Sequence, residues 1–138
     1  MLHKTRGIVL HSVKFSESSL VVKIYTEAFG IQSYLVKGVR SPKSKVKPVL
    51  FQPLTLLDLV VYRKERNVLQ SIKEIRISHP YQSVPFDIRK SSIALFVNEV
   101  VYRALGEEEP NGPLFEFLWN AFLLLDAVEE PFHHFHLL

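Results

Sequence analysis

Five short segments with the composition of β-strands follow one another up to Ile77. They restrict the fold more than any other feature of the sequence. Turn-forming residues separate them. An open sheet of such strands would leave two unpaired edges exposed, so a small closed barrel is predicted. The predicted strands are Thr5 to Phe15, Leu20 to Thr26, Ile31 to Val39, Leu54 to Arg63 and Val68 to Ile77.

The length and connections of these segments favour the OB-fold. Five strands in about 75 residues with a long third connection are typical of this five-stranded Greek-key barrel. The helix that usually joins its third and fourth strands would have to lie within Lys43 to Gln52, where it could be only short. An SH3-like barrel is the alternative architecture.

Side-chain alternation assigns faces to the first and third predicted strands. Ile8 and Leu10, and after a polar break Val13 and Phe15, supply the apolar positions of the first. In the third, one face carries Ile31, Ser33, Leu35 and Lys37, and the other carries Gln32, Tyr34 and Val36.

After Pro80 the hydrophobic period changes from about 2 to about 3.6, which predicts helices. Asp87 is a suitable N-cap for the first helix, and Gly106 lies where its C′ residue is expected. Pro113 suits the first turn of a second helix, Leu114 to Val128. That helix is apolar almost all round, so we expect it to be buried. Two helices cannot cover so much apolar surface, which suggests that the chain is truncated or that something else covers the second helix.

Charge divides the chain at the same place. Residues 1–80 contain 14 Lys and Arg against 5 Asp and Glu, whereas residues 81–138 contain 3 against 9. The hydrophobic content of 47% excludes a disordered chain. We therefore predict an α+β protein with an OB-fold domain over residues 1–80 and the start of a helical domain over residues 81–138, each with its own partners.

A cluster of cations follows the third strand. Because unpaired charges do not stay buried and Gly38, Pro42 and Pro48 interrupt regular structure, we expect this loop to lie in water. A polyanion is its natural partner, although a solvated, flexible connection is equally compatible with the sequence. The candidate phosphate-binding residues are Lys37, Arg40, Lys43, Lys45 and Lys47, with no acidic residue among them.

Other residues of the basic half add to a nucleic-acid hypothesis. Arg6 and Lys23 are weaker candidates for phosphate contacts, and Tyr34 is the favoured candidate among the tyrosines for stacking on a base. Binding through phosphates predicts little sequence preference and a steep dependence on salt.

Several other functions lack a sequence signal. The chain has no cysteine, which excludes disulfides and thiolate metal sites in these residues and fits a cytoplasmic protein. His133, His134 and His136 form the only dense histidine group, and an amphipathic helix start explains them better than zinc binding. No nucleophile elbow, phosphate-binding glycine loop or carboxylate pair can be recognised, so we expect neither an enzyme nor a cofactor. No secretory signal or membrane-spanning run is recognisable in these residues.

The first half resembles the bacterial DNA repair and recombination mediator family RecO. The order and spacing of several short motifs carry the resemblance, which is looser in the helical part. The motifs are Ile8-Val9-Leu10, Glu17-Ser18, Thr26 with Gly30, Lys37-Gly38-Val39-Arg40 followed by Lys43-Ser44, Phe51-Gln52-Pro53-Leu54 and Leu56-Leu57-Asp58-Leu59.

The resemblance implies an OB-fold that binds single- and double-stranded DNA, followed by a helical domain, in a cytoplasmic, nucleoid-associated protein. RecO proteins anneal complementary strands and, with RecR, help to load RecA onto DNA coated by single-strand binding protein. The site for the tail of that protein is expected to be incomplete here, because family chains are longer. Many members carry a cysteine zinc site, which nothing here matches.

Two rivals to a non-catalytic DNA-binding module stay open. The barrel and the apolar second helix could form a protein-interaction module, or the OB-fold could bind RNA. A mainly apolar interface would lose little affinity as salt rises, and competition between RNA and DNA would reveal an RNA-binding protein.

Overall fold

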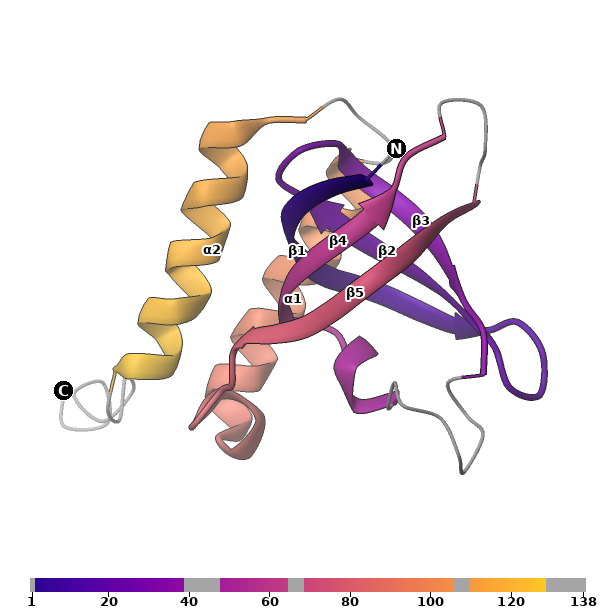
Figure 1. Ribbon diagram of the computed structural model, residues 1–138. Coiled ribbons are helices and arrows are strands. Elements are labelled where there is room, and N and C mark those ends of the chain that lie inside the picture. The colour runs from indigo at the N-terminus through magenta and orange to yellow at the C-terminus, as the bar shows by residue number, and fades with distance from the viewer. Residues whose placement is uncertain (1, 39–47, 65–68, 106–109, 129–138) are drawn as a thin grey trace, which may run out of the picture.

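The computed structural model describes residues 2–38, 48–64, 69–105 and 110–128. Five strands come first and two α-helices follow them (Figure 1). The elements are β1 Leu2–Lys14, β2 Leu20–Thr26, β3 Gly30–Val36, the 3₁₀ helix η1 Pro48–Phe51, β4 Leu56–Tyr62, β5 Leu69–His79, the 3₁₀ helix η2 Val84–Phe86, α1 Ile88–Leu105 and α2 Gly112–Ala127.

The five strands close into a barrel in the order β1-β2-β3-β5-β4. β1 pairs with both β2 and β4, all pairs but one are antiparallel, and the parallel pair joins β3 to β5. The short helix η1 lies between β3 and β4, within the segment where a short helix was expected. These features confirm the predicted OB-fold barrel, in preference to an SH3-like one, and the α+β class.

Strand boundaries follow the sequence pattern closely. β2 has the predicted bounds, whereas β1 begins earlier, at Leu2. β3 ends at Val36 instead of Val39, and Gly38 has a φ of +74°, a backbone conformation that does not continue a strand. β4 begins after Leu54, whose φ of +82° is held by hydrogen bonds from its N–H to Val9 O and from the Tyr81 hydroxyl to its carbonyl.

A β-bulge in β1 exchanges the two faces of that strand. Val9 pairs with Ile24, but the next pair along the ladder is His11 with Lys23, so Leu10 is an extra residue. Because alternation restarts after the bulge, Val13 lies on the outer side of the barrel together with Leu10. The polar break between these two apolar residues, His11-Ser12, therefore follows directly after the bulge.

The barrel interior forms one hydrophobic core. Gly7 is needed there, since a Cβ atom at this position would lie 2.6 Å from Ile24 Cγ2 and 2.9 Å from Leu59 Cδ1. Phe51 from η1 is 1% exposed and belongs to the same core, so the short helix closes the barrel from one end. The buried residues of this inner core are Val9, Val22, Ile24, Tyr34, Phe51, Leu57, Leu59 and Val61.

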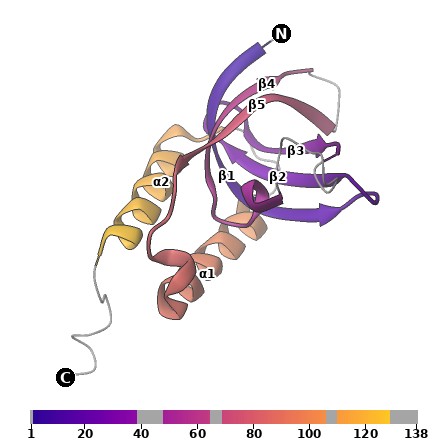
Figure 2. The same cartoon turned by 60° about the horizontal axis from the view of Figure 1, so that its bottom comes forward.

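A second core lies outside the barrel, where α1 and α2 cover part of the outer surface (Figure 2). Barrel residues such as Ile8 and Tyr25 meet Ala94 of α1 and Phe115 of α2 in this outer core. The helices and the barrel are therefore joined by a shared core. The division near residue 80 into units with different partners stays a prediction.

The second helix is buried on one side only. Phe115, Leu118, Trp119 and Phe122 face the outer core, but Phe117 and Leu124 are 68% and 65% exposed. This agrees with the expectation that two helices cannot cover all of its apolar surface, because α2 lies against the barrel along one face only (Figure 1). Within the described residues no helix is long and apolar enough to cross a membrane.

The helix ends follow the predicted caps where the structure describes them. The Asp87 carboxylate accepts hydrogen bonds from the backbone N–H of Arg89 and Lys90, which confirms it as the cap of α1. Asn111 caps α2 by accepting from Leu114 N at 3.0 Å, and Pro113 lies in the first turn as expected. Gly106 lies outside the described residues.

Candidate nucleic-acid interface

The outer surface of β1, β2 and β3 continues beyond the part covered by the helices, and its cross-strand pairs form two rows. His11 pairs with Lys23 and Lys23 with Ser33; in the next row Val13 pairs with Val21 and Val21 with Leu35. Directly paired residues share a face. We call this face the outer strip: His11, Lys23 and Ser33, then Val13, Val21 and Leu35, then Phe15 and Lys37 at its free end; Ser33 itself is buried.

The free end of the outer strip lies where the β1–β2 turn meets the end of β3. The N–H of Phe15 bonds to Ser19 O at 2.9 Å, so the β1–β2 ladder continues by one pair and Phe15 falls on the same face as Val13. Lys37 follows β3 directly and is exposed. In Figures 1 and 2 the β1–β2 turn and the end of β3 lie at the same end of the barrel.

The other end of the strip is bounded by α1. The rings of His11 and Tyr102 are stacked, with centroids 5.4 Å apart and planes 15° apart. The strip thus runs from the helix to the free end of the hairpin, and its rows contain Lys23 and Lys37 but no Asp or Glu among the described residues. The nearest acidic residue in sequence is Glu17, in the β1–β2 turn.

The predicted cations fall into three groups. Lys23 and Lys37 belong to the outer strip. Arg6 lies elsewhere, as described below. The remaining four lie within residues 39–47, outside the described residues: Arg40, Lys43, Lys45 and Lys47. Their proposed role stays a prediction.

Tyr34 does not offer a ring face to a base in this structure. Its side chain is 1% exposed and lies in the inner core, on the face of β3 opposite Lys37. Burial raises the pKa of its hydroxyl well above the ordinary value, and the nearby charge of Arg63 opposes this only in part. The structure therefore places the favoured stacking candidate inside the barrel.

Arg6 is engaged by carboxylates. Its guanidinium donates to both oxygens of Glu27, at 3.0 and 2.9 Å, and it also pairs with Glu116 of α2. The hydrogen bond from Arg6 lowers the pKa of Glu27, against the effect of burial. The guanidinium carbon also lies 5.3 and 4.8 Å from the ring centroids of Phe115 and Trp119. Arg6 therefore fastens α2 to the barrel rather than presenting its charge to a phosphate.

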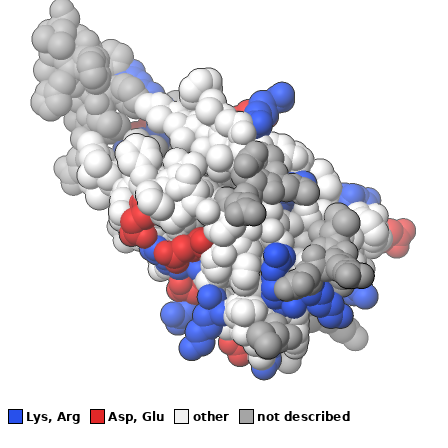
Figure 3. All heavy atoms as spheres, turned by 90° about the horizontal axis from the view of Figure 1, so that it is seen from above, with Lys and Arg blue, Asp and Glu red and all other residues white. Residues whose placement is uncertain are grey.

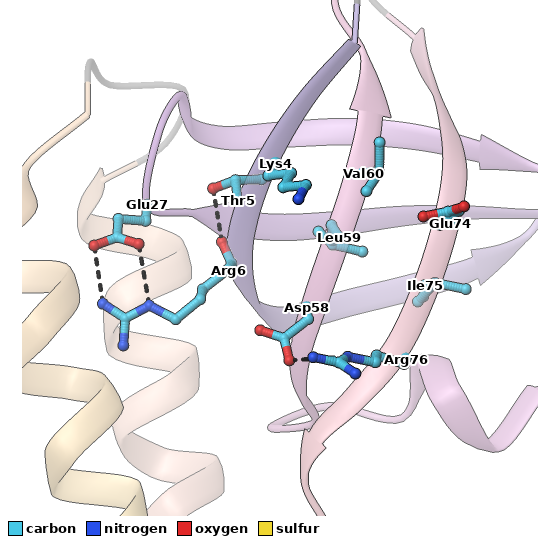
Figure 4. Close-up of a pocket in the computed structure, with 10 residues that line it drawn as sticks. All are labelled: Lys4, Thr5, Arg6, Glu27, Asp58, Leu59, Val60, Glu74, Ile75 and Arg76. Carbon is cyan, nitrogen blue, oxygen red and sulfur yellow. Dashed lines mark hydrogen bonds and ion pairs between the residues drawn. The ribbon is translucent and has the colours of Figure 1, made fainter.

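Beside Arg6, the outer surface of β1, β4 and β5 carries a hollow of about 510 Å³ (Figure 4). Arg76 pairs with Asp58 at 3.3 Å across this surface. Its charged lining consists of the cations Lys4, Arg6 and Arg76 and the carboxylates Glu27, Asp58 and Glu74. Because the two signs balance, a polyanion would gain little here, and the outer strip is the better candidate.

Figure 3 shows the distribution of charge on one face of the molecule. Lys and Arg side chains are most numerous over the lower part of this view, with several Asp and Glu side chains among them, whereas uncharged side chains predominate over the upper part.

A polar cluster joins the end of α2 to the segment between β5 and α1. The Asp126 carboxylate accepts from the backbone N–H of Gln82, Ser83 and Val84 and lies 2.8 Å from His79 Nε2. Burial acts to raise the pKa of Asp126, but these hydrogen bonds outweigh it and hold that pKa well below the ordinary range.

This cluster has the residue types of a catalytic triad but not its connections. Lys90 donates to Ser83 Oγ at 2.8 Å, and Ser83 Oγ donates in turn to the backbone carbonyl of Asp126. In a triad the histidine would bond to the serine. Here His79 and Ser83 both bond to Asp126, so the cluster reads as a structural clamp.

Two family models cover nearly the whole chain. One, described as "Recombination protein O N terminal", matches residues 1–81, and another, "Recombination protein O C terminal", matches residues 85–138. The chain belongs to the RecO family.

Curated relatives agree with this assignment. Proteins named DNA repair protein RecO from Phocaeicola vulgatus and Bacteroides fragilis are 45% and 46% identical over 137 residues. The RecO protein of Flavobacterium johnsoniae is 40% identical over 136 residues. These alignments cover 98–99% of this chain but 57% of each relative, so the chain spans just over half of their length.

For three residues of this RecO-family chain, the sequence did not predict the exposure or burial that the structure shows. Phe15 is 59% exposed at the end of the outer strip, although it read as an ordinary strand residue. Its place in alternation with Val13, directly before a Ser-Glu-Ser turn, is the signal that could have found it. Asn98 and Asp126 are polar residues in predicted helices, and their burial depends on contacts that are distant in sequence.

Proposed function

We propose that this chain is the non-catalytic DNA-binding part of a RecO-type recombination mediator. The outer strip would follow the sugar-phosphate backbone, with Lys23 and Lys37 as phosphate contacts. The basic segment Arg40, Lys43, Lys45 and Lys47 would add further phosphate contacts, because it follows Lys37 closely in the sequence. The observation that supports the proposal is the outer strip itself, which carries Lys23 and Lys37 and has no Asp or Glu in its rows among the described residues.

The role of the whole protein is proposed on the same basis. Single- and double-stranded DNA would be the substrates, and annealing of strands and loading of RecA with RecR the activities. Partners would include RecR, single-strand binding protein and, indirectly, RecA, in the cytoplasm at the nucleoid. Membership of the RecO family and the name DNA repair protein RecO borne by its relatives support this assignment.

Fluorescence anisotropy of a labelled oligonucleotide tests the DNA-binding proposal directly. The chain is titrated at about 50 and 200 mM salt, where binding through several phosphates should weaken by roughly 10³-fold or more for six contacts and proportionately less for fewer. Absence of binding by the folded chain at the lower salt would contradict the proposal.

A matched pair of charge reversals locates the contact. Lys43→Glu with Lys45→Glu changes the basic segment, and Lys4→Glu with Lys73→Glu makes the same change in net charge on β1 and β5. The first pair should reduce the slope of log affinity against log salt by about two, since each lost phosphate contact removes about one. Equal losses from both pairs would show that only net charge matters.

One observation favours a protein partner as a second candidate. Ile88 and Phe96 of α1 are 80% and 70% exposed, which leaves apolar surface on the helical side of the described structure. The affinity of a protein bound there would depend little on salt, unlike that of DNA on the strip.

Competition with RNA in the same titration separates an RNA-binding barrel from a DNA-binding one.

A further inference from the structure

Phe15 is the large aromatic residue at the free end of the outer strip. Its side chain is 59% exposed, and the next row toward the barrel, Val13, Val21 and Leu35, is apolar. One cation of the strip lies near it: Lys37, at the end of β3, two strands away. Because neighbouring strands lie about 4.8 Å apart, the backbones of Phe15 and Lys37, two strands apart, are separated by roughly 10 Å.

The β1–β2 turn holds Phe15 in place. The N–H groups of Phe15 and Ser16 both bond to Ser19 O, at 2.9 and 3.3 Å, and Ser19 is buried. The residue is thus fixed at the last pair of a hairpin, with its ring toward solvent. An aromatic ring already ordered in this way loses little conformational freedom when a flat ligand stacks on it.

We propose that Phe15 stacks on an unpaired base of the bound strand and so gives the outer strip a preference for single-stranded over duplex DNA. This inference rests on the proposed function, because the cations of the strip, Lys23 and Lys37, would hold the backbone. Their phosphate contacts would be common to single strands and duplexes. Stacking on Phe15 would be limited to single strands, since the faces of the bases in a duplex are already covered by their neighbours.

The position of Phe15 separates it from the other exposed phenylalanines. Phe86, Phe96 and Phe117 are at least as exposed, but they lie in η2, α1 and α2, away from the outer strip. Within the described residues, Phe15 is the phenylalanine that shares a sheet face with Lys23. This difference supplies matched controls.

The test measures the affinity of four proteins for three probes. The proteins are the unaltered chain, Phe15→Ala, Phe15→Leu and the control Phe117→Ala; the probes are a mixed-sequence single strand, the same strand with abasic sites, and its duplex. Phe15→Ala should weaken single-strand binding by about 5- to 100-fold, the range for one lost stack, and leave duplex and abasic binding unchanged. Phe15→Leu should lose nearly as much, because it keeps apolar area but no aromatic face.

Three outcomes overturn the inference. Phe15→Ala could leave single-strand binding unchanged, it could weaken all three probes equally, or Phe15→Leu could bind like the unaltered chain. In each case salt-dependent binding by the unaltered chain would still support the proposed function, so the two failures are distinguishable. Thermal unfolding checks that the variants fold, and Phe15→Trp, which keeps a ring at the same place, should restore the preference for single strands.

Discussion

The backbone N–H of Ser83 lies 2.8 Å from a carboxylate oxygen of Asp126, 43 residues further along the chain. The same carboxylate bonds to the N–H groups on either side and to His79, while Lys90 bonds to the carbonyls of Asp126 and Val128. The last turn of α2 is therefore fastened to the start of the helical part by one side chain that is 4% exposed.

Asp126→Asn should destabilise the fold and change its response to acid. Loss of charge-assisted hydrogen bonds should cost about 2 to 3 kcal/mol at pH 7. Because the folded-state pKa of Asp126 is lowered, its contribution is complete above the ordinary value of 3.8 and is lost as the pH falls through the folded-state pKa. Urea unfolding from pH 7 down to pH 2 should show the two proteins converging below about pH 4. A constant difference across this range would contradict the ionised clamp.

Arg6→Gln should affect stability rather than DNA binding. It removes the two-pronged contact with Glu27 and the link to Glu116, a loss of about 1 kcal/mol for a group 28% exposed in its side chain. The salt dependence of DNA binding should keep its slope, because this guanidinium already has two carboxylate partners. The measurement is the same anisotropy titration alongside thermal unfolding. A slope reduced by about one would instead make Arg6 a phosphate contact.

Gly7→Ala should overpack the inner core. The added methyl would lie within 3.0 Å of Ile24 and Leu59, and forcing extra volume into a packed core costs about 1 to 3 kcal/mol. Gly112→Ala is the control, since nothing lies within 4 Å of a Cβ there. Chemical unfolding should show a loss for the first variant and a change of at most about 0.5 kcal/mol for the second. Equal effects would place the strain elsewhere.

Asn98→Ala should weaken the attachment of α1 to the barrel. The Asn98 side-chain amide donates to Leu10 O at 2.8 Å, and removing the donor leaves a buried carbonyl without its partner, which costs about 1 to 3 kcal/mol. Asn98→Asp should cost more at neutral pH, because an ionised carboxylate cannot donate and would face the carbonyl. Denaturation midpoints rank the two variants. A smaller loss for aspartate would show that the Leu10 carbonyl is satisfied in another way.

Local patterns predicted the strands and helices well because alternation and capping are properties of neighbouring residues. β2 was predicted with its bounds, and Asp87 was recognised as the cap of α1. The choice of Tyr34 as the stacking candidate did not anticipate that its side chain is buried. Alternation already placed Tyr34 opposite Lys37, and a barrel interior accepts the face without lysine, so its burial could have been inferred.

Contacts that join distant segments could not be predicted in this way. Arg6 read as a free cation because Glu116, its partner on α2, is 110 residues away. The burial of Asp126 likewise depends on where α2 ends relative to Ser83. Both contacts depend on how the helices pack on the outside of the barrel. The periodicity of side chains along one strand or helix does not predict that packing.

The bulge at Leu10 also limits how the length of the first strand can vary. Since alternation has a period of two, a single residue inserted or deleted in the half of β1 that pairs with β2 would turn Val13 and Phe15 inward and Ser12 and Lys14 outward. Natural variation there should therefore come in pairs of residues, or be absorbed by moving the bulge. The extra residue in β1 thus keeps the exposed side chains of the strip on the same side of the sheet as the side chains that the helices cover.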